Sequence, residues 1–390
     1  MLFTFAGGSG HFLPLTPIAR EAMRSGHVVA FAGQTAMIST IERAGFAAFD
    51  TGGSTLRTSP EIIPLLPPDI EREEGAIRNG FALRTARTRA DALLPLCTEW
   101  KPDVVVCDEV DFGAMIVAER LGIPHATVIV LAAGAFTRTD VIADSLNVVR
   151  KEHGLPADPD AIMPGRDLII SPVPPSFRDP RYPLPETAHA IRPYVLESIE
   201  TDDVPAWIAD LGKLPVVYFT LGTIFNLESG DLFQRVLAGL RDLPVDVVVT
   251  VGRELDPEVL GDQPPHVRIE QFIPQAALLP HCDLVISHGG SGSVIGSLAF
   301  GLPQVLIPMG ADQLHNAERG EALGFARVLD PITLTPEDIR KVTAEMLADT
   351  NSRECAQRSA NEIVALPGSE YAVQLLERLG PQTLESTFSN

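Results

Sequence analysis

Residues 283–307, with the sequence DLVISHGGSGSVIGSLAFGLPQVLI, contain one complete unit of the predicted fold. The unit begins with Asp283–Ser287, a short apolar run typical of a buried strand. A loop rich in glycine and serine then leads into a helical stretch, and Gln304–Ile307 is the next strand. Parallel strands are joined through such helical crossovers, so this stretch predicts a parallel α/β sheet.

The same alternation of short apolar strands and amphipathic helices recurs on both sides of this stretch. Further strands are predicted at Leu2–Ala6, Val28–Ala32, Phe46–Phe49, Val104–Cys107, Ala126–Leu131, Val216–Leu221, Val245–Val251 and Val267–Phe272. Helices are predicted at about 70–96, 112–121, 336–347, 352–365 and 369–379. Between about 132 and 207 the prolines are expected to exclude central strands and to mark loops and a connection. The prediction is two similar α/β halves with a cleft between them.

Length and composition agree with a folded protein of two domains. The chain has 390 residues and a mass of 41.9 kDa, more than one hydrophobic core usually serves. A net charge of −21 repels the phosphates of nucleic acids and anionic lipids, so neither nucleic acid nor a stably bound membrane is an expected partner. No apolar stretch approaches the ~20 residues of a membrane span. Scattered cysteines and a strand at the first residues, without a signal peptide, fit a cytoplasmic protein.

The first candidate site is the glycine-rich loop 7–11, Gly-Gly-Ser-Gly-His, directly after the first strand. His11 is expected to project from the carboxyl end of that strand into the cleft, where ligands of such sheets bind. Asp108 follows the strand Val104–Cys107 at the same edge, and a carboxylate there would fix the tautomer of the imidazole and raise its basicity. Asp111 could take this part or could cap the following helix, and a purely structural histidine is the alternative reading of His11.

Two further candidate sites lie in the second half. Residues 287–293, Ser-His-Gly-Gly-Ser-Gly-Ser, place free backbone N–H groups and hydroxyls at a helix N-terminus, which suits a diphosphate. The loop lacks the Gly-Lys-Ser/Thr of a Walker motif. Thr223 offers another hydroxyl after the first strand of this half. Asp312 and Gln313 follow a strand and can bind sugar hydroxyls, although an aspartate at that position is also an ordinary helix cap.

These three sites, in this order, resemble the inverting nucleotide-sugar glycosyltransferases of family 1, which have the GT-B fold of two facing Rossmann-like domains. The resemblance covers nearly the whole chain and is most specific over 271–316, QFIPQAALLPHCDLVISHGGSGSVIGSLAFGLPQVLIPMGADQLHN, which is similar to the donor signature in its bacterial, natural-product form. It implies an acceptor-binding domain over 1–200 and a donor-binding domain over 201–368. Residues 369–390 are expected to form a helix that packs back on the first domain, followed by a polar tail.

The resemblance also implies roles for single residues. His11 matches the general base of the family, and Asp108 is the best match to its partner. The donor is expected to contact Gly10, Thr223, Phe272, Gln275, His288, Gly290, Ser293, Asp312 and Gln313. Of these, Phe272 matches the aromatic that stacks on the base. Plant members carry a glutamate for the ribose hydroxyls where this chain has Gly296, a departure that fits a dTDP donor, because thymidine lacks the 2′-hydroxyl.

The expected function is transfer of a sugar, a deoxysugar in many similar enzymes, from dTDP or UDP to a hydroxyl of a hydrophobic small molecule such as a polyketide. No metal is needed if the loop at 287–293 and the helix N-terminus offset the charge of the leaving diphosphate. The DxD sequence at Asp158 is accordingly interpreted as a solvated turn. A nucleotide-sugar 2-epimerase on the same fold and a non-catalytic helper that binds nucleotide sugars are the alternatives, and homodimerisation is left open.

The acceptor side carries weaker signals. Phe81, Phe112 and Phe136 could line an apolar acceptor pocket, and core packing explains the same residues equally well. A basic cluster in the helix predicted at 70–96 is favoured as a solvated helix face, with guidance of an anionic acceptor as the alternative; its members are Arg78, Arg84, Arg87 and Arg89.

Overall fold

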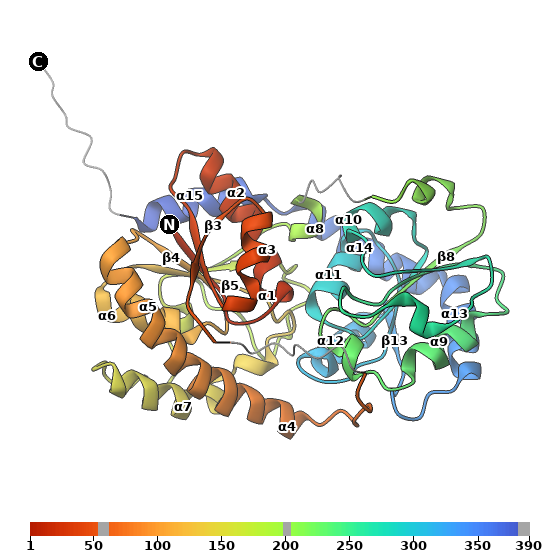
Figure 1. The fold of residues 1–390 in the computed structure, drawn as a ribbon, viewed down its shortest axis with the longest axis horizontal. Helices are drawn as coiled ribbons and strands as arrows, with labels where there is room; N and C mark the ends of the chain where they lie inside the picture. The colour runs from red at the N-terminus through yellow and green to blue at the C-terminus, as the bar shows by residue number, and fades with distance from the viewer. Residues whose placement is uncertain (54–61, 198–203, 381–390) are drawn as a thin grey trace, which may run out of the picture.

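The computed structural model describes residues 1–53, 62–197 and 204–380, and it contains two parallel sheets side by side (Figure 1). The first sheet has the strand order β3-β2-β1-β4-β5-β6-β7 and the second the order β10-β9-β8-β11-β12-β13. The strands of the first sheet are β1 (Leu2–Thr4), β2 (Ala30–Gly33), β3 (Ala47–Asp50), β4 (Val105–Asp108), β5 (His125–Val128), β6 (Leu168–Ser171) and β7 (Ala188–Ala190). Those of the second are β8 (Val216–Thr220), β9 (Asp246–Thr250), β10 (Val267–Glu270), β11 (Leu284–Ser287), β12 (Gln304–Leu306) and β13 (Ala326–Val328).

Helices cover both faces of each sheet (Figure 1). In the first half they are α1 (Ser9–Phe12), α2 (Thr16–Arg24), α3 (Ile38–Arg43), α4 (Ile70–Gly75), α5 (Ala86–Trp100), α6 (Phe112–Leu121), α7 (Thr139–Glu152) and α8 (Tyr194–Glu197). In the second half they are α9 (Leu232–Leu240), α10 (Gln275–Leu278), α11 (Ser291–Ala299), α12 (Gln313–Ala322), α13 (Pro336–Ala348) and α14 (Thr350–Ala365), and α15 (Ser369–Leu379) ends the described chain. The predicted doubly wound α/β fold is therefore confirmed.

Strand residues alternate between two cores, as the period of two in a strand requires. In β1, Leu2 packs into the core under α5 and α6, whereas its neighbour Phe3 packs into the core under α2 and α3. In β8, Val217 and Val216 divide in the same way between the two cores of the second half. Both sheets are buried on two faces, which is why their strands read as continuous apolar runs.

The region from 132 to 207 is where the sequence-based prediction was wrong. Strands β6 and β7 and the fourteen-residue helix α7 lie in it, and all three are absent from the prediction. The prolines at 172, 174 and 175 follow β6 directly, so they end this strand instead of interrupting it. Strand β7 lies at the edge of the sheet and pairs with β6 alone. An edge strand tolerates proline because the missing N–H is not needed for pairing on its open side. The short strand β13 was missed as well.

The helix predicted at 70–96 forms as one rod whose middle is wound differently. After α4, residues Ala76–Thr85 adopt a π-helix, and α5 continues to Trp100. A π-helical segment of this length is rare, and π-helical turns inside α-helices are frequent at functional sites. This one carries Phe81 to within 6.2 Å of the His11 ring, measured between ring centroids.

The last helix returns to the first half. Helix α15 lies against α2, and its Leu375 and Leu376 are buried in the same core as Ile18 (Figure 1). The chain thus crosses between the halves twice, and the backbone N–H of Arg192 donates to the carbonyl of Pro367 at 2.8 Å where the crossings meet. The predicted domain boundary at 200 and the tail at 381–390 fall outside the described residues. Among the described residues, no helix combines the length and the apolar character that crossing a membrane requires.

Candidate active site

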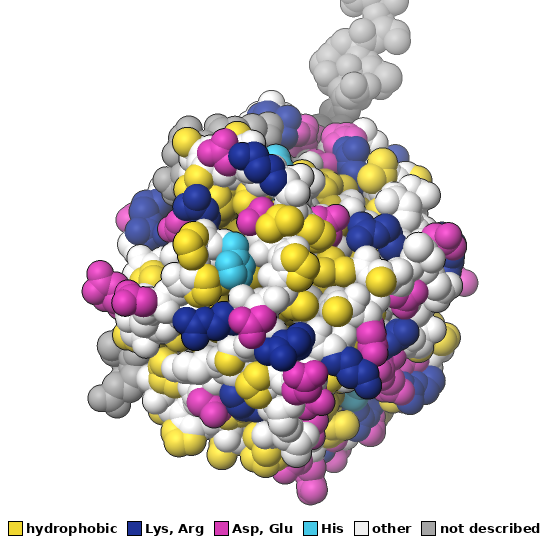
Figure 2. Space-filling model, turned by 90° about the vertical axis from the view of Figure 1, so that its right-hand side faces the viewer, with side chains coloured by type: hydrophobic (Ala, Val, Ile, Leu, Met, Phe, Trp, Pro, Cys, Tyr) yellow, Lys and Arg dark blue, Asp and Glu magenta, His cyan; other side chains and the backbone are white. Residues whose placement is uncertain are grey.

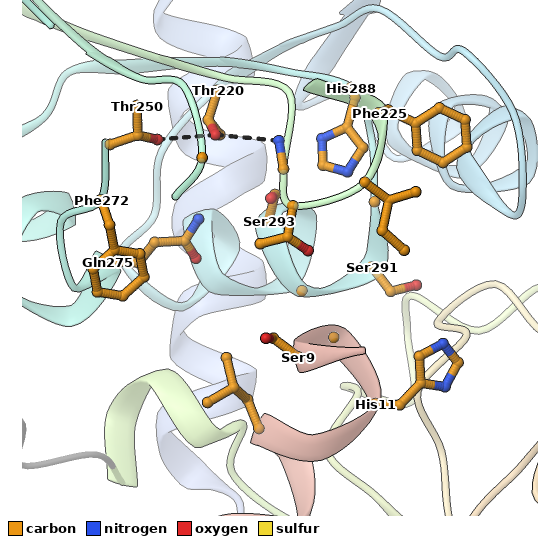
Figure 3. A pocket seen from close by; sticks show the side chains of 18 of the residues that line it. Ser9, His11, Thr220, Phe225, Thr250, Phe272, Gln275, His288, Ser291 and Ser293 are labelled. Atoms are coloured by element: carbon orange, nitrogen blue, oxygen red, sulfur yellow. Dashed lines mark hydrogen bonds between the residues drawn. The ribbon is translucent and has the colours of Figure 1, made fainter. Parts of the chain in front are cut away.

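A cavity of about 300 Å³ opens between the two halves, lined by loops at the carboxyl ends of strands from both sheets. Ser9 and His11 line it from the first half (Figure 3). His288, Ser291 and Ser293 face them from the second half, on the loop between β11 and α11 and at the start of that helix. The arrangement follows from the topology, because parallel sheets present their ligand-binding loops where the strand order reverses. Here that is the β1/β4 and β8/β11 junctions.

His11 and Asp108 form a hydrogen-bonded pair at this edge. Nδ1 of His11 lies 2.5 Å from Oδ2 of Asp108, the fully buried last residue of β4. Burial alone would lower the pKa of His11, but the attraction of the Asp108 carboxylate outweighs it and raises the pKa above its ordinary value of 6.5. A Cβ atom at Gly7 would lie 2.3 Å from Cδ2 of His11, so the loop needs glycine there for the ring to reach Asp108.

The alternative partner, Asp111, has a different role. Its carboxylate caps α6 by accepting from the backbone N–H of Ala114, and it accepts from the hydroxyl of Thr4 at 2.7 Å. It also forms an ion pair with Arg89, whose Nη2 lies 2.6 Å from Oδ2. Arg89 is 3% exposed, so its assignment to a solvated helix face was wrong: the residue faces inward toward a buried carboxylate. Arg87 of the same helix does lie at the surface, paired with Glu152.

The ring of His288, in the loop predicted to hold the diphosphate, lies between two glycines. Gly290 belongs to the same loop, and Gly222 follows β8. Cβ atoms at Gly222 and Gly290 would lie 2.6 and 2.4 Å from that ring, so both positions must remain glycine for His288 to be seated there. Burial lowers the pKa of His288 to about 4, so its imidazole is neutral at physiological pH and acts as a hydrogen-bonding group. Ser293 and Thr223 also line the cavity, as does Gly10 from the opposite half.

The far end of the cavity holds Phe272 and Gln275, which are predicted to contact the donor nucleotide. Phe272 lines it with 36% of its surface exposed, and the guanidinium carbon of Arg253 lies 3.9 Å from the centre of its ring. Gln275 lines the cavity beside Gly296, where a Cβ atom would be 3.3 Å from Oε1 of Gln275. The amide of Gln275 therefore lies next to the place where plant members of the family carry a glutamate.

A chain of hydroxyls also lines this end, and the sequence-based prediction missed it. The hydroxyl of Tyr218 lies 2.7 Å from that of Thr250, which donates to Thr220 at 3.0 Å (Figure 3 shows the two threonines). Thr220 and Thr250 are the last residues of β8 and β9. Their position at the carboxyl ends of neighbouring strands was the signal that could have identified them.

The predicted sugar-binding pair is held by its surroundings. Oδ2 of Asp312 accepts from the hydroxyl of Ser291 at 2.6 Å and from Nδ2 of Asn316 at 2.8 Å. Oε1 of Gln313 accepts from the backbone N–H groups of Met309 and Gly310, which directs its Nε2 amide away from them. Asp312 precedes α12 without capping it through its side chain, so the ordinary helix-cap reading does not apply. Burial raises the pKa of Asp312, and the two donors oppose that rise.

On the acceptor side the predictions divide. Phe81 lies beside His11 with the two rings at 19° to each other, but it is not among the residues that line the cavity, so its place in an acceptor pocket stays a prediction. Phe112 is fully buried under the first sheet, and Phe136 is 4% exposed with its ring against His315, so neither lines the cavity and both predictions were wrong. Asp158 accepts from two backbone N–H groups in a turn away from the cavity, in agreement with its interpretation.

Glu109 is a further residue that the sequence-based prediction missed. It is 3% exposed, and its Oε1 accepts from the backbone N–H groups of Val130 at 2.7 Å and Leu131 at 2.5 Å. Both of these residues line the cavity. Burial raises the pKa of Glu109 to about 7. The sequence analysis assigned a role only to its neighbour Asp108, as the partner of His11. No sequence pattern indicates that Glu109 would hold the backbone of the loop at 130–131.

The fold and the cavity define a GT-B glycosyltransferase, and comparison with known proteins agrees. The chain is 30% identical to 4′-demethylrebeccamycin synthase of Lentzea aerocolonigenes over 95% of this chain and 97% of the relative, and 27% identical to tylactone mycaminosyltransferase of Streptomyces fradiae over 97% and 92%. Residues 234–379 match the C-terminal domain model of erythromycin biosynthesis protein CIII-like proteins. The chain therefore belongs to the natural-product glycosyltransferases of this family.

Solved structures show the same fold over the whole chain. The spinosyn rhamnosyltransferase SpnG complexed with thymidine diphosphate superposes with a TM-score of 0.79 at 24% identity, covering 96% of this chain and 99% of the other. The glycosyltransferase SnogD from Streptomyces nogalater superposes with a TM-score of 0.75 at 25% identity, over 97% and 99%.

Proposed function

We propose that this glycosyltransferase moves a deoxysugar from a dTDP-sugar to a hydroxyl of a hydrophobic natural product, inverting the anomeric carbon. The observation that carries the proposal is the pair of His11 and Asp108, 2.5 Å apart, at the wall of a cavity whose opposite wall is the loop at 287–293. Inversion at the anomeric carbon needs a base on one side of that carbon and a bound diphosphate leaving group on the other. The positions of His11 and of the loop at 287–293 support this arrangement.

In the proposed mechanism, His11 removes the proton from the acceptor hydroxyl as its oxygen attacks the anomeric carbon. Nδ1 of His11 faces Asp108, so Nε2 is left to receive the proton, and the carboxylate stabilises the imidazolium that forms. The bond to the diphosphate breaks on the opposite face of the sugar. The N-terminus of α11, Ser293 and the neutral imidazole of His288 offset the charge on the leaving group, which is why we propose that no metal is needed.

The donor nucleotide is proposed to be dTDP. A ribose 2′-hydroxyl is usually held by a carboxylate in the plant members of the family, and Gly296 supplies none, with the amide of Gln275 beside it. One comparison supports this choice, because SpnG is described in complex with thymidine diphosphate. UDP stays the second candidate nucleotide.

The proposed partners are thus small molecules, acting in the cytoplasm. The net charge of −21 disfavours nucleic acid. On the face of the second half drawn in Figure 2, lysine and arginine side chains are interspersed with aspartate and glutamate and form no continuous basic surface. The 2-epimerase and helper-protein alternatives are not favoured, because the relatives reported above are named as synthases or transferases of sugars and keep the full length of this chain.

The first test of the proposal is calorimetric titration of the protein with dTDP and UDP, with and without EDTA. We expect dTDP to bind more tightly than UDP, and EDTA to leave its affinity unchanged. Binding of UDP in preference to dTDP would contradict the inference from Gly296. Binding of neither nucleotide would contradict the proposed function. Turnover of a dTDP-deoxysugar panel with polyketide aglycones then identifies the acceptor.

A second prediction concerns the diphosphate. Replacing His288 with alanine removes one hydrogen-bonding group from a charged ligand, so the dissociation constant for dTDP should rise about 10- to 100-fold. Because the pKa of His288 is about 4, the ring is neutral above that pH, and its contribution should not change between the mildly acidic and neutral range. His281→Ala, at an exposed position in the same half, is the matched control. Equal affinities of the His288→Ala variant and the unaltered protein would remove this residue from the donor site.

A further inference from the structure

One loop of the first half makes two hydrogen bonds across the cavity to the second half. The loop follows β5, and the backbone N–H of Ala132 donates to the hydroxyl oxygen of Ser291 at 2.7 Å. The next N–H, that of Ala133, donates to Oδ1 of Asn316 at 3.2 Å. More than 150 residues separate the partners in each bond, and each bond joins one half of the molecule to the other.

Both contacts end on the same carboxylate oxygen. The hydroxyl of Ser291 donates to Oδ2 of Asp312 at 2.6 Å, and Nδ2 of Asn316 donates to the same atom at 2.8 Å. Asn316 is fully buried and Asp312 is 7% exposed, so water offers little competition for these bonds. The backbone N–H groups of Ala132 and Ala133 are therefore connected to the carboxylate of Asp312, the first through Ser291 and the second through Asn316.

The hydroxyl of Ser291 is oriented by its partners. A serine hydroxyl has one proton and two lone pairs. Here the backbone N–H of Ala132 and Nδ2 of Asn316, which lies 3.1 Å away, both donate to the oxygen. The single proton is then left for Asp312. Without the donation from Ala132, Asn316 alone of these two donors would orient the hydroxyl, so the bond to Asp312 depends in part on a group in the other half of the molecule.

The loop is itself held firmly in the first half. Glu109 accepts from the two backbone N–H groups that precede Ala132 in the loop, those of Val130 and Leu131. Glu109 directly follows Asp108, the partner of His11. The same short segment of chain therefore orders the base on one side of the cavity and the loop that reaches Asp312 on the other.

From this connection we infer that Ser291, itself held by the loop of the first half, is a positioning residue that fixes Asp312 for the donor sugar, with Asn316 as its second support. The inference rests on the proposed function, because it assigns Asp312 to the sugar. The hydroxyl of Ser291 gives its proton to Asp312, so the bridge is expected to act on the sugar part of the donor. The acceptor-side loop thus completes the donor-sugar site.

The test compares Ser291→Ala with the unaltered protein in two measurements. Ser291 lies in the loop at 287–293, but its hydroxyl proton is donated to Asp312, so calorimetry with dTDP should show unchanged affinity. Steady-state turnover of a dTDP-sugar should show kcat/KM lower by about 10- to 100-fold, the loss of a hydrogen bond to a charged group. Ser291→Thr keeps the hydroxyl and should restore most of the activity. Ser293→Ala is the contrasting variant, because it should weaken the binding of dTDP.

A double-variant comparison separates this role from a structural one. In an Asp312→Asn background, Ser291→Ala should lower kcat/KM little further, because Ser291 acts through the carboxylate that Asp312→Asn has already removed. A full additional loss in that background, or weaker binding of dTDP by Ser291→Ala alone, would overturn the inference. If the unaltered protein binds neither dTDP nor UDP, the proposed function fails. If it binds dTDP, and Ser291→Ala turns over normally, only the inference fails.

Discussion

Replacing His11 with alanine should lower turnover by about 10²- to 10⁴-fold, the range typical of a lost general base. Affinity for dTDP should stay unchanged, because His11 faces the acceptor side of the cavity and the diphosphate loop belongs to the other half. The measurements are steady-state turnover of a dTDP-sugar with its acceptor and calorimetry with dTDP. His27→Ala, a partly exposed histidine paired with Glu377 far from the cavity, is the matched control.

The pH dependence of turnover tests the same assignment. A base must be unprotonated to act, and Asp108 raises the pKa of His11 above 6.5. Activity should therefore rise as the pH increases through that raised pKa and be lost below it. In Asp108→Asn the carboxylate is gone, so the midpoint should move to lower pH while the maximal rate falls. Turnover of His11→Ala equal to that of the unaltered protein would refute His11 as the base.

Replacing Arg89 with methionine should lower the free energy of unfolding of the first half by about 3–5 kcal/mol, the cost of leaving a buried charge without its partner. The guanidinium lies 2.6 Å from Asp111 and also donates to the hydroxyl of Thr51 and, at 3.1 Å, to the carbonyl of Ala32. Asp111 is fully buried, so no water replaces these contacts. Urea denaturation, followed by hydrogen exchange of β1 and β4, measures the change.

Arg87→Met is the matched control for this prediction. Arg87 lies two residues earlier on the same helix and pairs with Glu152 at 2.7 Å, but both partners are about 40% exposed. An exposed ion pair contributes little to stability, so we expect Arg87→Met to leave the free energy of unfolding nearly unchanged. Similar losses in the two variants would mean that burial does not decide the energetics of this helix face.

Most of the fold could be predicted from the sequence because buried parallel strands appear as apolar runs between helical patterns. The exceptions have a physical reason. Strand β6 has only four residues and ends directly before Pro172, so a count of prolines in that region concealed it. The three-residue strand β13 is too short to show a period. The π-helical winding of 76–85 has no mark in the sequence pattern, which fits an α-helix equally well.

The candidate site could be predicted where reactive side chains follow the carboxyl ends of neighbouring strands. His11 and Asp108 follow neighbouring parallel strands, so the topology alone brings them together. Apolar residues gave no such guidance: Phe112 and Phe81 have the same side chain, yet one is in the core and the other beside His11. The contact between Ala132 and Ser291 could not be predicted, because a backbone N–H is present at nearly every residue and only the closed fold selects this one.

The return of α15 to the first half has a consequence for building chimeric enzymes. The second half is inserted into the first, and its two joints lie together where the backbone of Arg192 meets that of Pro367. A foreign nucleotide-sugar module spliced between these two points would leave the host with its helices α1 to α7 and with α15. A single-crossover fusion, in contrast, would give the host a terminal helix whose apolar face evolved against a different α2.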